Sequence, residues 1–183
     1  IFDSKMHNFL EKYFFINNFE PNILKNQDKN TIIIYRNYHN KLDTNLIIKI
    51  RNFSKKNNLK FLLANNFKLA IKLNLDGVYI PSFNKNFKHL TYSFKKKFFL
   101  VGSAHNLKEI RIKEKQKVSR IVLSSIFKKN KNYLGLNKFK NYLKLSNERF
   151  IALGGIDDKN LKKINFLNVY GYAGITFFQK KGP

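Results

Sequence analysis

Short apolar runs recur along the chain, each followed by polar or glycine-bearing residues and then by a stretch with helical spacing. Runs of this length and composition are typical of strands. The sequence predicts eight of them: Tyr13–Ile16, Thr31–Tyr35, Lys60–Leu63, Gly77–Ile80, Phe98–Val101, Arg120–Leu123, Arg149–Leu153 and Val169–Phe177.

Segments with helical spacing lie between these runs. In one of them Phe67 and Ile71 fall near one face, whereas Lys68 and Lys72 fall on another. Strands that are apolar without alternation and are separated by helices indicate a parallel sheet covered on both faces. Eight such units favour an α/β fold, a small closed (β/α)8 TIM barrel, over an open sheet. The predicted helices are Leu42–Phe53, Phe67–Leu75, Leu107–Lys117, Leu136–Leu145 and Lys159–Phe166.

Residues with capping side chains precede three of these helices: Asn65 or Asn66, then Asn106, then Asp157–Asp158. With 183 residues, the chain is shorter than the ~250 usual for such barrels, so we expect one domain over residues 1–183. Because only Gln179–Pro183 follow the eighth run, the last covering helix is expected to be missing. Residues 1–11 are expected to form a helical extension, since Phe2, Met6, Phe9 and Leu10 have helical spacing.

Composition narrows the class of protein. Hydrophobic residues make up 43% of the chain and aromatic residues 15%, which argues against a disordered chain. No apolar stretch approaches the ~20 residues needed to span a bilayer, so no membrane association is expected. The absence of cysteine excludes disulfides, thiolate metal sites and thiol nucleophiles, and it is compatible with a reducing cytoplasm, the expected location.

The formal net charge of +25 is the most unusual feature of the composition. It would ordinarily point to nucleic acid, an acidic membrane face or anionic substrates. Lysines are spread along the whole chain, with small clusters at Lys95–Lys97, Lys128–Lys131 and Lys180–Lys181. This distribution favours a solvated basic surface over a nucleic-acid site, with a polyanion patch as the alternative.

Four segments resemble the thiamine phosphate synthase and thiazole tautomerase (TenI) superfamily. They are Leu69 to Val78, Val101 to Glu109, Ser125 to Phe127, and Ile151 to Ile156. Family members carry a G-x-S-x-H stretch after the fifth strand and an apolar-G-G-I stretch after the seventh. The resemblance covers roughly residues 13–178 and implies an enzyme of thiamine biosynthesis whose site lies at the carboxyl ends of the strands.

The resemblance implies phosphate binding by Gly154 and Gly155, whose backbone N–H groups can approach a phosphate closely. A simple strand-to-helix turn would also explain two glycines. After the eighth strand the family places a small hydroxyl residue near the phosphate, and here Thr176 and Gln179 stand at or near that position.

Ser103 and His105 match family positions that face the site, and in the tautomerase branch the histidine is implicated in proton transfer. Histidine suits general acid–base work near neutral pH, although a role in capping the following helix is equally open. Arg36 matches an arginine of the synthase's Q-x-R-x-K segment, which holds the pyrimidine diphosphate. Ile34 and Tyr38 replace the glutamine and lysine of that segment.

In the synthase, two acidic residues after the third and fourth strands hold Mg²⁺ beside the diphosphate. The matching positions here read Ala64, Asn65 and Asn84, and neutral amides are much weaker magnesium ligands than carboxylates. We therefore expect no metal and no cofactor unless the synthase activity holds, and we expect Asn65 and Asn84 to contact substrate. Three further candidates for substrate contact follow the sixth strand, namely Ser125, Lys129 and Lys131.

Three hypotheses follow. The first is a thiamine-biosynthesis enzyme that binds a thiazole phosphate, with His105 and Ser103 as catalytic residues and no metal. The second is thiamine phosphate synthase, with Arg36 and the lysines of residues 128–131 compensating for the lost acids. The third is a degenerate, non-catalytic barrel that binds phosphate ligands or nucleic acid. The expected partners are small phosphorylated thiazole or pyrimidine compounds, and a homo-oligomer is compatible with the sequence.

Overall fold

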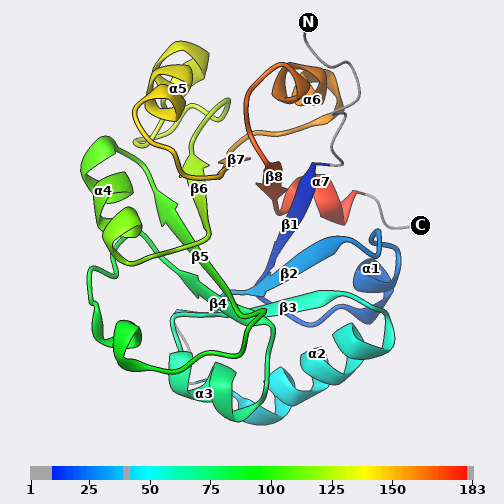
Figure 1. Cartoon of the computed structure of the whole chain (residues 1–183). Helices are drawn as coiled ribbons and strands as arrows, with labels where there is room; N and C mark the ends of the chain where they lie inside the picture. Colours follow the sequence, from blue (N-terminus) through cyan, green and yellow to red (C-terminus); the bar gives the residue numbers. More distant parts are fainter. Residues whose placement is uncertain (1–9, 39–41, 181–183) are drawn as a thin grey trace, which may run out of the picture.

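Eight parallel strands form a closed barrel in the computed structural model, which describes residues 10–38 and 42–180 (Figure 1). Each strand pairs with the next, and β8 pairs with β1, so that Phe14 lies between Ile33 of β2 and Gly174 of β8. The strands are β1 Glu11–Ile16, β2 Thr31–Tyr35, β3 Lys60–Ala64, β4 Gly77–Ile80, β5 Phe99–Ala104, β6 Arg120–Ser124, β7 Phe150–Leu153 and β8 Gly171–Gly174.

Helices surround the barrel on its outer side (Figure 1). Their bounds are α1 Pro21–Lys25, α2 Thr44–Lys56, α3 Phe67–Lys72, α4 Leu107–Lys115, α5 Gly135–Lys144, α6 Asp158–Asn165 and α7 Thr176–Gln179, and a 3-10 helix, η1, spans Lys88–Thr91. The side chains of Asn66, Asn106 and Asp157 cap α3, α4 and α6, in agreement with the capping expected from the sequence.

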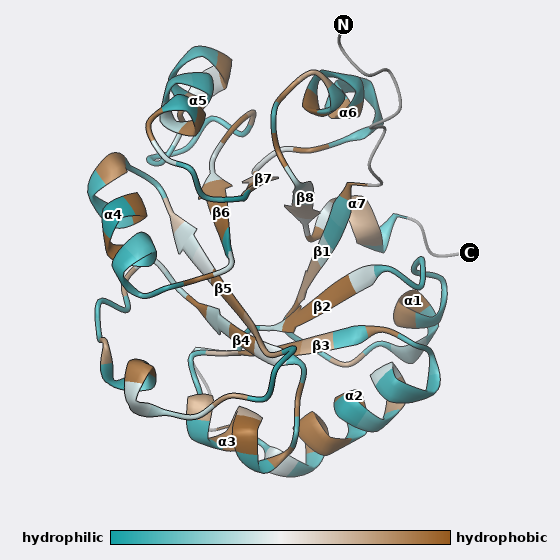
Figure 2. Ribbon diagram, in the orientation of Figure 1, coloured by the Kyte–Doolittle hydropathy of each residue, from teal (hydrophilic) through white to brown (hydrophobic). Residues whose placement is uncertain are grey.

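Alternate residues of each strand point to two separate cores. The barrel interior holds side chains such as Phe15, Ile34, Leu62, Tyr79 and Val122. The larger core lies between the strands and the helices and includes Ile33, Ile47 and Ile110. The strands are accordingly apolar over most of their length, while the helices carry hydrophilic residues on their outer surfaces (Figure 2).

Charged residues close the amino-terminal end of the barrel. Glu11 of β1 accepts two hydrogen bonds from the Arg120 guanidinium of β6, at 2.9 and 2.8 Å, and one from the Tyr13 hydroxyl at 2.6 Å. Burial by itself would raise the pKa of Glu11. The hydrogen bonds from Arg120 and Tyr13 outweigh this effect, so the net pKa of Glu11 is lowered. The Lys60 ammonium lies 4.5 Å from the centre of the Phe99 ring at the same end.

The closed barrel and all eight predicted strands are confirmed. The structure differs from the prediction in the segments before and after the strands. α1 was not predicted, because five residues that begin with proline carry no helical period. The eighth strand ends at Gly174, since Thr176 and Phe177 belong to α7, so one short helical turn stands where no helix was expected. The predicted helical extension lies mostly outside the described residues, and Glu11 already belongs to β1. None of the described helices is both long and apolar enough to span a bilayer.

The Glu11–Arg120 pair should stabilise the fold more than a surface ion pair does. Replacing Glu11 with Gln should lower the free energy of unfolding by about 2 kcal/mol, because the largely buried Arg120 then loses its counter-charge. Because the pKa of Glu11 is lowered in the folded state, this stabilisation is present above about pH 4.5 and is lost as the pH falls further.

Denaturant titrations between pH 3 and pH 7 measure this effect. Asp28→Asn is the matched control, since its ion pair with Lys12 is more exposed and should contribute about 1 kcal/mol or less. Equal losses in the two variants would contradict a special role for the Glu11–Arg120 pair.

Candidate functional site

The residues proposed from the sequence gather at the carboxyl end of the barrel, where the loops after β2 to β8 begin. The structure places several of them in three groups. The first joins β5 and β6 around His105, the second joins the loops after β6 and β7 at Gly154–Gly155, and the third joins the loops after β3 and β4 at Asn65 and Asn84.

His105 follows β5 and is held by the last residue of β6. Its Nδ1 lies 3.1 Å from the carbonyl oxygen of Ser124 and 2.9 Å from the Ser124 hydroxyl. A carbonyl oxygen only accepts hydrogen bonds, so this contact places the proton on Nδ1 and leaves the lone pair of the neutral ring on Nε2. The imidazole does not cap α4, because Asn106 does so. The His105 backbone N–H instead donates to Glu109 Oε2 at 2.8 Å.

Gly154 and Gly155 form a turn that packs tightly against the loop after β6. Both have positive φ angles, +111° and +72°. A Cβ on Gly154 would lie 2.2 Å from the Ser125 hydroxyl oxygen, and a Cβ on Gly155 would lie 2.7 Å from the backbone nitrogen of Lys128. The Gly154 carbonyl accepts hydrogen bonds from the N–H groups of Phe127 and Lys128. Within residues 10–38 and 42–180, neither glycine N–H donates a hydrogen bond.

Ser125, expected to contact substrate, is occupied within the protein. It is buried, and its hydroxyl donates to the Lys128 carbonyl at 2.8 Å. Ser125 thus shapes the loop that supports the glycine turn. Lys129 and Lys131 of this loop are exposed.

Aromatic residues fill the interior below the mouth of the barrel. Phe15 and Tyr79 meet edge to face with ring centres 5.1 Å apart, and the Arg36 guanidinium carbon lies 5.1 Å from the centre of the Phe15 ring. Burial raises the pKa of Tyr79, and the neighbouring Ser103 hydroxyl and the charge of Arg36 act in the opposite direction. The Ser103 side chain thus interacts with the Tyr79 hydroxyl, and Ser103 itself is buried.

Asn65 and Asn84 lie side by side, with the Asn84 Nδ2 donating to Asn65 Oδ1 at 2.5 Å. The loop that carries Asn84 is anchored from behind by Lys113 of α4, which is fully buried. The Lys113 ammonium donates to the carbonyls of Pro81 and Asn84 and to the Gln116 side chain, at 2.9, 2.8 and 2.8 Å. Burial lowers the pKa of Lys113 to about 8.

Gly102, part of the β5 motif, makes room for this lysine. A Cβ on Gly102 would lie 2.7 Å from the Lys113 Cδ. In this chain Gly102 directly precedes Ser103, whereas the family motif G-x-S-x-H has one residue between the glycine and the serine. Only the S-x-H part therefore keeps the spacing of the family motif. The packing against Lys113 explains the glycine without a ligand.

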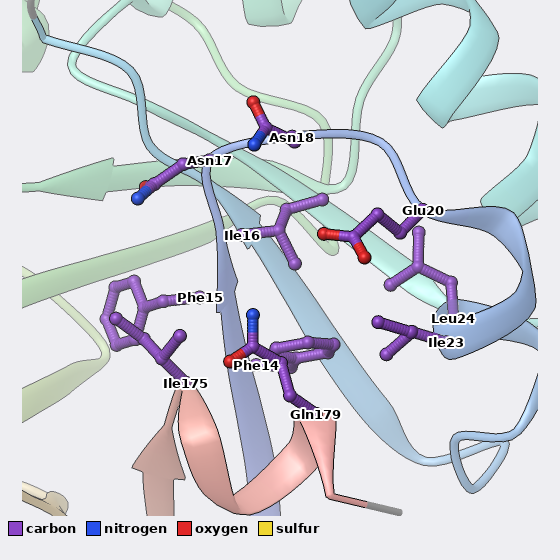
Figure 3. Close-up of a pocket in the computed structure, with 10 residues that line it drawn as sticks. All are labelled: Phe14, Phe15, Ile16, Asn17, Asn18, Glu20, Ile23, Leu24, Ile175 and Gln179. Atoms are coloured by element: carbon purple, nitrogen blue, oxygen red, sulfur yellow. The ribbon is translucent and has the colours of Figure 1, made fainter. Parts of the chain in front are cut away.

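The two candidates after β8 both belong to α7. Thr176 begins α7 and is exposed. Gln179 lies in a cavity of about 90 Å³ between the end of β1, α1 and α7, where Glu20 and Asn17 also line the walls (Figure 3). No residue of β7 or its loop lines this cavity, and the Glu20 carboxylate makes it a poor place for a phosphate.

Sequence reasoning missed four residues that organise this end of the barrel. Ser124 follows Val122 by two positions, so strand alternation places it on the inner face, and this signal was present in the sequence. Tyr79 was identified only as part of a strand. Lys113 and Gln116 carry no such signal, because their partners lie on a loop about thirty residues earlier.

Comparisons with known proteins match residues 22–178 to the family model described as thiamine monophosphate synthase. A putative thiamine-phosphate synthase 2 from Aquifex aeolicus is 31% identical over 135 residues, which cover 71% of this chain and 72% of that protein. A thiamine-phosphate synthase from Methanococcus vannielii is 24% identical over 132 residues, or 70% of this chain and 64% of that one. The structure of a thiamine phosphate pyrophosphorylase from Pyrococcus furiosus superposes with a TM-score of 0.72 at 17% identity, covering 94% of this chain and 91% of that chain.

The glycine turn should tolerate no side chain. Gly154→Ala should lower the free energy of unfolding by about 3 kcal/mol, because the methyl group collides with Ser125 and the positive φ is unfavourable for alanine. Gly174→Ala is the control, since its methyl group meets only ordinary contacts and should change stability by less than about 1 kcal/mol. Thermal and denaturant unfolding compare the two variants, and a fully stable Gly154→Ala protein would refute this packing.

Lys113 should make stability depend on alkaline pH. Because its folded pKa is about 8 and its ordinary value is 10.5, the unfolded chain binds more protons between these values. The free energy of unfolding should therefore rise through this range, by up to about 3 kcal/mol from this residue. Lys113→Met should remove that rise, whereas Lys115→Met, on the exposed side of the same helix, should keep it. Parallel pH–stability curves for the wild type and Lys113→Met would contradict the assignment.

Proposed function

Because this chain belongs to the thiamine monophosphate synthase family, we propose that it binds a thiazole phosphate at the carboxyl end of the barrel and moves a proton on it through His105. The family is one of enzymes of thiamine biosynthesis whose substrates are small phosphorylated pyrimidines and thiazoles. The observation that carries the proposal is the contact between His105 Nδ1 and the Ser124 carbonyl.

This contact supports a role as general base. With Nδ1 protonated, Nε2 of the neutral ring holds the lone pair, and in the described part of the chain it has no hydrogen-bond partner. Such an imidazole accepts a proton from a bound substrate at Nε2 and returns it to a second position of the same substrate. Ser124 fixes the orientation of the ring, and Ser103 lies two residues before it on β5, on the inner face of the barrel.

The phosphate of the substrate is assigned to the glycine turn. The free N–H groups of Gly154 and Gly155 supply donors at the carboxyl end of β7, next to β6, which carries Ser124. Lys128 and the exposed Lys129 and Lys131 add positive charge along the adjoining loop. Thr176 begins α7 after β8, the strand that pairs with β7, while the place of Gln179 beside Glu20 argues against its contribution.

The residues at the family's magnesium position do not fit that ion. Asn65 and Asn84 are neutral, and both amide oxygens already accept hydrogen bonds, from Asn84 Nδ2 and from the Asn86 N–H. The Lys113 ammonium, bound to the Asn84 carbonyl, adds a positive charge behind them. Mg²⁺ prefers carboxylates and substrate oxygens in an octahedral arrangement. The proposed proton transfer by His105 therefore involves no metal ion.

Thiamine phosphate synthase activity is the second candidate, because the relatives from Aquifex and Methanococcus carry that name. Arg36 lies at the mouth beside Phe15, where its guanidinium could hold a diphosphate. Incubation with pyrimidine diphosphate and thiazole phosphate, with and without Mg²⁺, distinguishes the two functions. Formation of thiamine phosphate establishes the synthase, and its absence under both conditions removes it.

His105→Asn tests the proposed acid–base role. The asparagine amide can still donate to the Ser124 carbonyl, but it has no counterpart of Nε2. Interconversion of thiazole phosphate tautomers, followed by NMR in deuterated water, should slow by about 10²- to 10⁴-fold while thiazole phosphate binding stays within a few-fold. Asn106→Asp, which preserves the helix cap next to His105, is the control. An unchanged rate in His105→Asn, or a loss confined to binding, would rule out the histidine as the base.

A further inference from the structure

A small cavity lies on the outer side of the barrel, between α3 and the segment that leads into β5. Its volume is about 90 Å³. From α3 and the turn after it, the buried Ala70 and Leu75 line the cavity together with Ile71, whose surface is 39% exposed. From the other segment, Phe94 and Phe98 line it with their rings stacked 4.7 Å apart. We call this cavity the α3 groove.

The α3 groove is separate from the candidate site. Leu75 precedes β4 and Phe98 directly precedes β5, so the groove lies toward the amino-terminal end of the barrel. His105 and the glycine turn stand at the carboxyl end, and neither of them lines the groove. A ligand in the α3 groove would therefore take no part in the proposed proton transfer.

The lining of the α3 groove suits an apolar side chain. The Lys95 ammonium donates to Asn74 Oδ1 at 2.9 Å, which ties the two walls together and occupies the amide oxygen at the edge. Most of the remaining lining is aliphatic or aromatic. Because the groove is smaller than the ~150 Å³ cavity that holds a benzene ring, a branched aliphatic side chain fits it better than an aromatic one.

Five exposed lysines lie on the two segments that form the groove. They are Lys68 and Lys72 of α3 and Lys95, Lys96 and Lys97 of the segment before β5. None of them forms an ion pair with another residue of the described part of the chain. Asp76 is the only acidic residue between positions 43 and 109, and its carboxylate accepts a hydrogen bond from the Phe61 N–H at 2.8 Å. The apolar groove is thus surrounded by positive charge that lacks a counter-charge.

This combination favours an acidic protein segment over other occupants. A second copy of the chain carries the same net charge of +25 and would be repelled. Single-stranded nucleic acid stacks its bases on exposed rings, whereas Phe94 and Phe98 stack on each other and are partly buried. A flat lipid surface does not fill a recess between two segments, but one side chain of a polypeptide does.

We propose that the α3 groove is a docking site for an acidic segment of a partner protein. The segment inserts one leucine- or isoleucine-sized side chain between Ile71 and Phe98, and its carboxylates lie against the five lysines. The buried apolar side chain supplies affinity, while the charges select the partner and speed its approach. This docking goes beyond the proposed function and does not require it.

A short synthetic peptide of glutamates around one central leucine tests the docking on the full chain. Its titration at low salt should shift the NMR signals of the Ile71 methyl groups and of the Ser93 and Lys95 amides, and added salt should weaken binding. The same peptide with serine in place of leucine should bind about tenfold more weakly, because the groove then stays unfilled. Equal affinities of the two peptides, or no binding of the leucine peptide, would overturn the groove.

Ile71→Asp should weaken binding of the leucine peptide by at least about tenfold, because it places a carboxylate at the edge of the groove. Leu145→Asp is the matched control, since it makes the same change of charge at another exposed apolar side chain, at the end of α5. Denaturant unfolding checks that both variants remain folded. Equal losses of affinity in the two variants would contradict docking at this groove.

The double variant Lys96→Glu and Lys97→Glu tests the charges without altering the groove and should also weaken binding by at least about tenfold. Lys162→Glu with Lys163→Glu is its control, because α6 carries these exposed lysines on the opposite side of the barrel from α3 (Figure 1). Equal effects of the two pairs would show that only the net charge matters and would overturn the site.

Two other anionic probes test the identity of the partner. Oligothymidylate and phosphatidylserine vesicles should leave the Ile71 and Ser93 signals unmoved at concentrations at which the leucine peptide shifts them. If either probe shifts these signals more readily than the peptide, an acidic protein segment is the wrong partner. Thiazole phosphate turnover should be unchanged in the Lys96 and Lys97 double variant, so failure of the docking and failure of the proposed function are observed separately.

Discussion

The pairing of β8 with β1 is the constraint on which the rest of the molecule depends. Strands of only four to six residues leave exposed backbone groups at each edge of an open sheet, and closure removes both edges. Closure also fixes direction: because all strands are parallel, every carboxyl end meets the same rim. His105, Gly154 and Asn65 are brought to one end of the molecule by hydrogen bonds that involve none of their side chains.

The sequence predicts the barrel well because its signals are local. Apolar runs without alternation mark strands buried on both faces, and asparagine or aspartate before an apolar face marks a helix start, as at Asn106 and Asp157. Short elements without a period, such as α1 and η1, give no such signal. The end of β8 was placed too late because Ile175 and Phe177 are as apolar as strand residues, yet they belong to the turn into α7.

The resemblance named candidate site residues, but it could not give the hydrogen bonds that connect them. The resemblance pointed to Asn65, Asn84, Gly154 and His105, yet it could not show which atoms they use. The tautomer of His105 depends on a carbonyl of β6, and the direction of the Asn84 amide depends on the backbone of Asn86. Both partners are backbone groups, which leave no mark in the sequence. Ser125 shows the converse, since a residue expected at the substrate proves to hold its own loop.

The contact between Gly102 and Lys113 has an evolutionary consequence. A side chain at position 102 would require the stem of Lys113 to move or to become shorter, and Val118 also lies close to this position. Related barrels that lack the lysine are released from this requirement, so the two positions should vary together among homologues. Such paired variation among homologues would show at which stage of their evolution a lysine at position 113 began to hold the loop after β4.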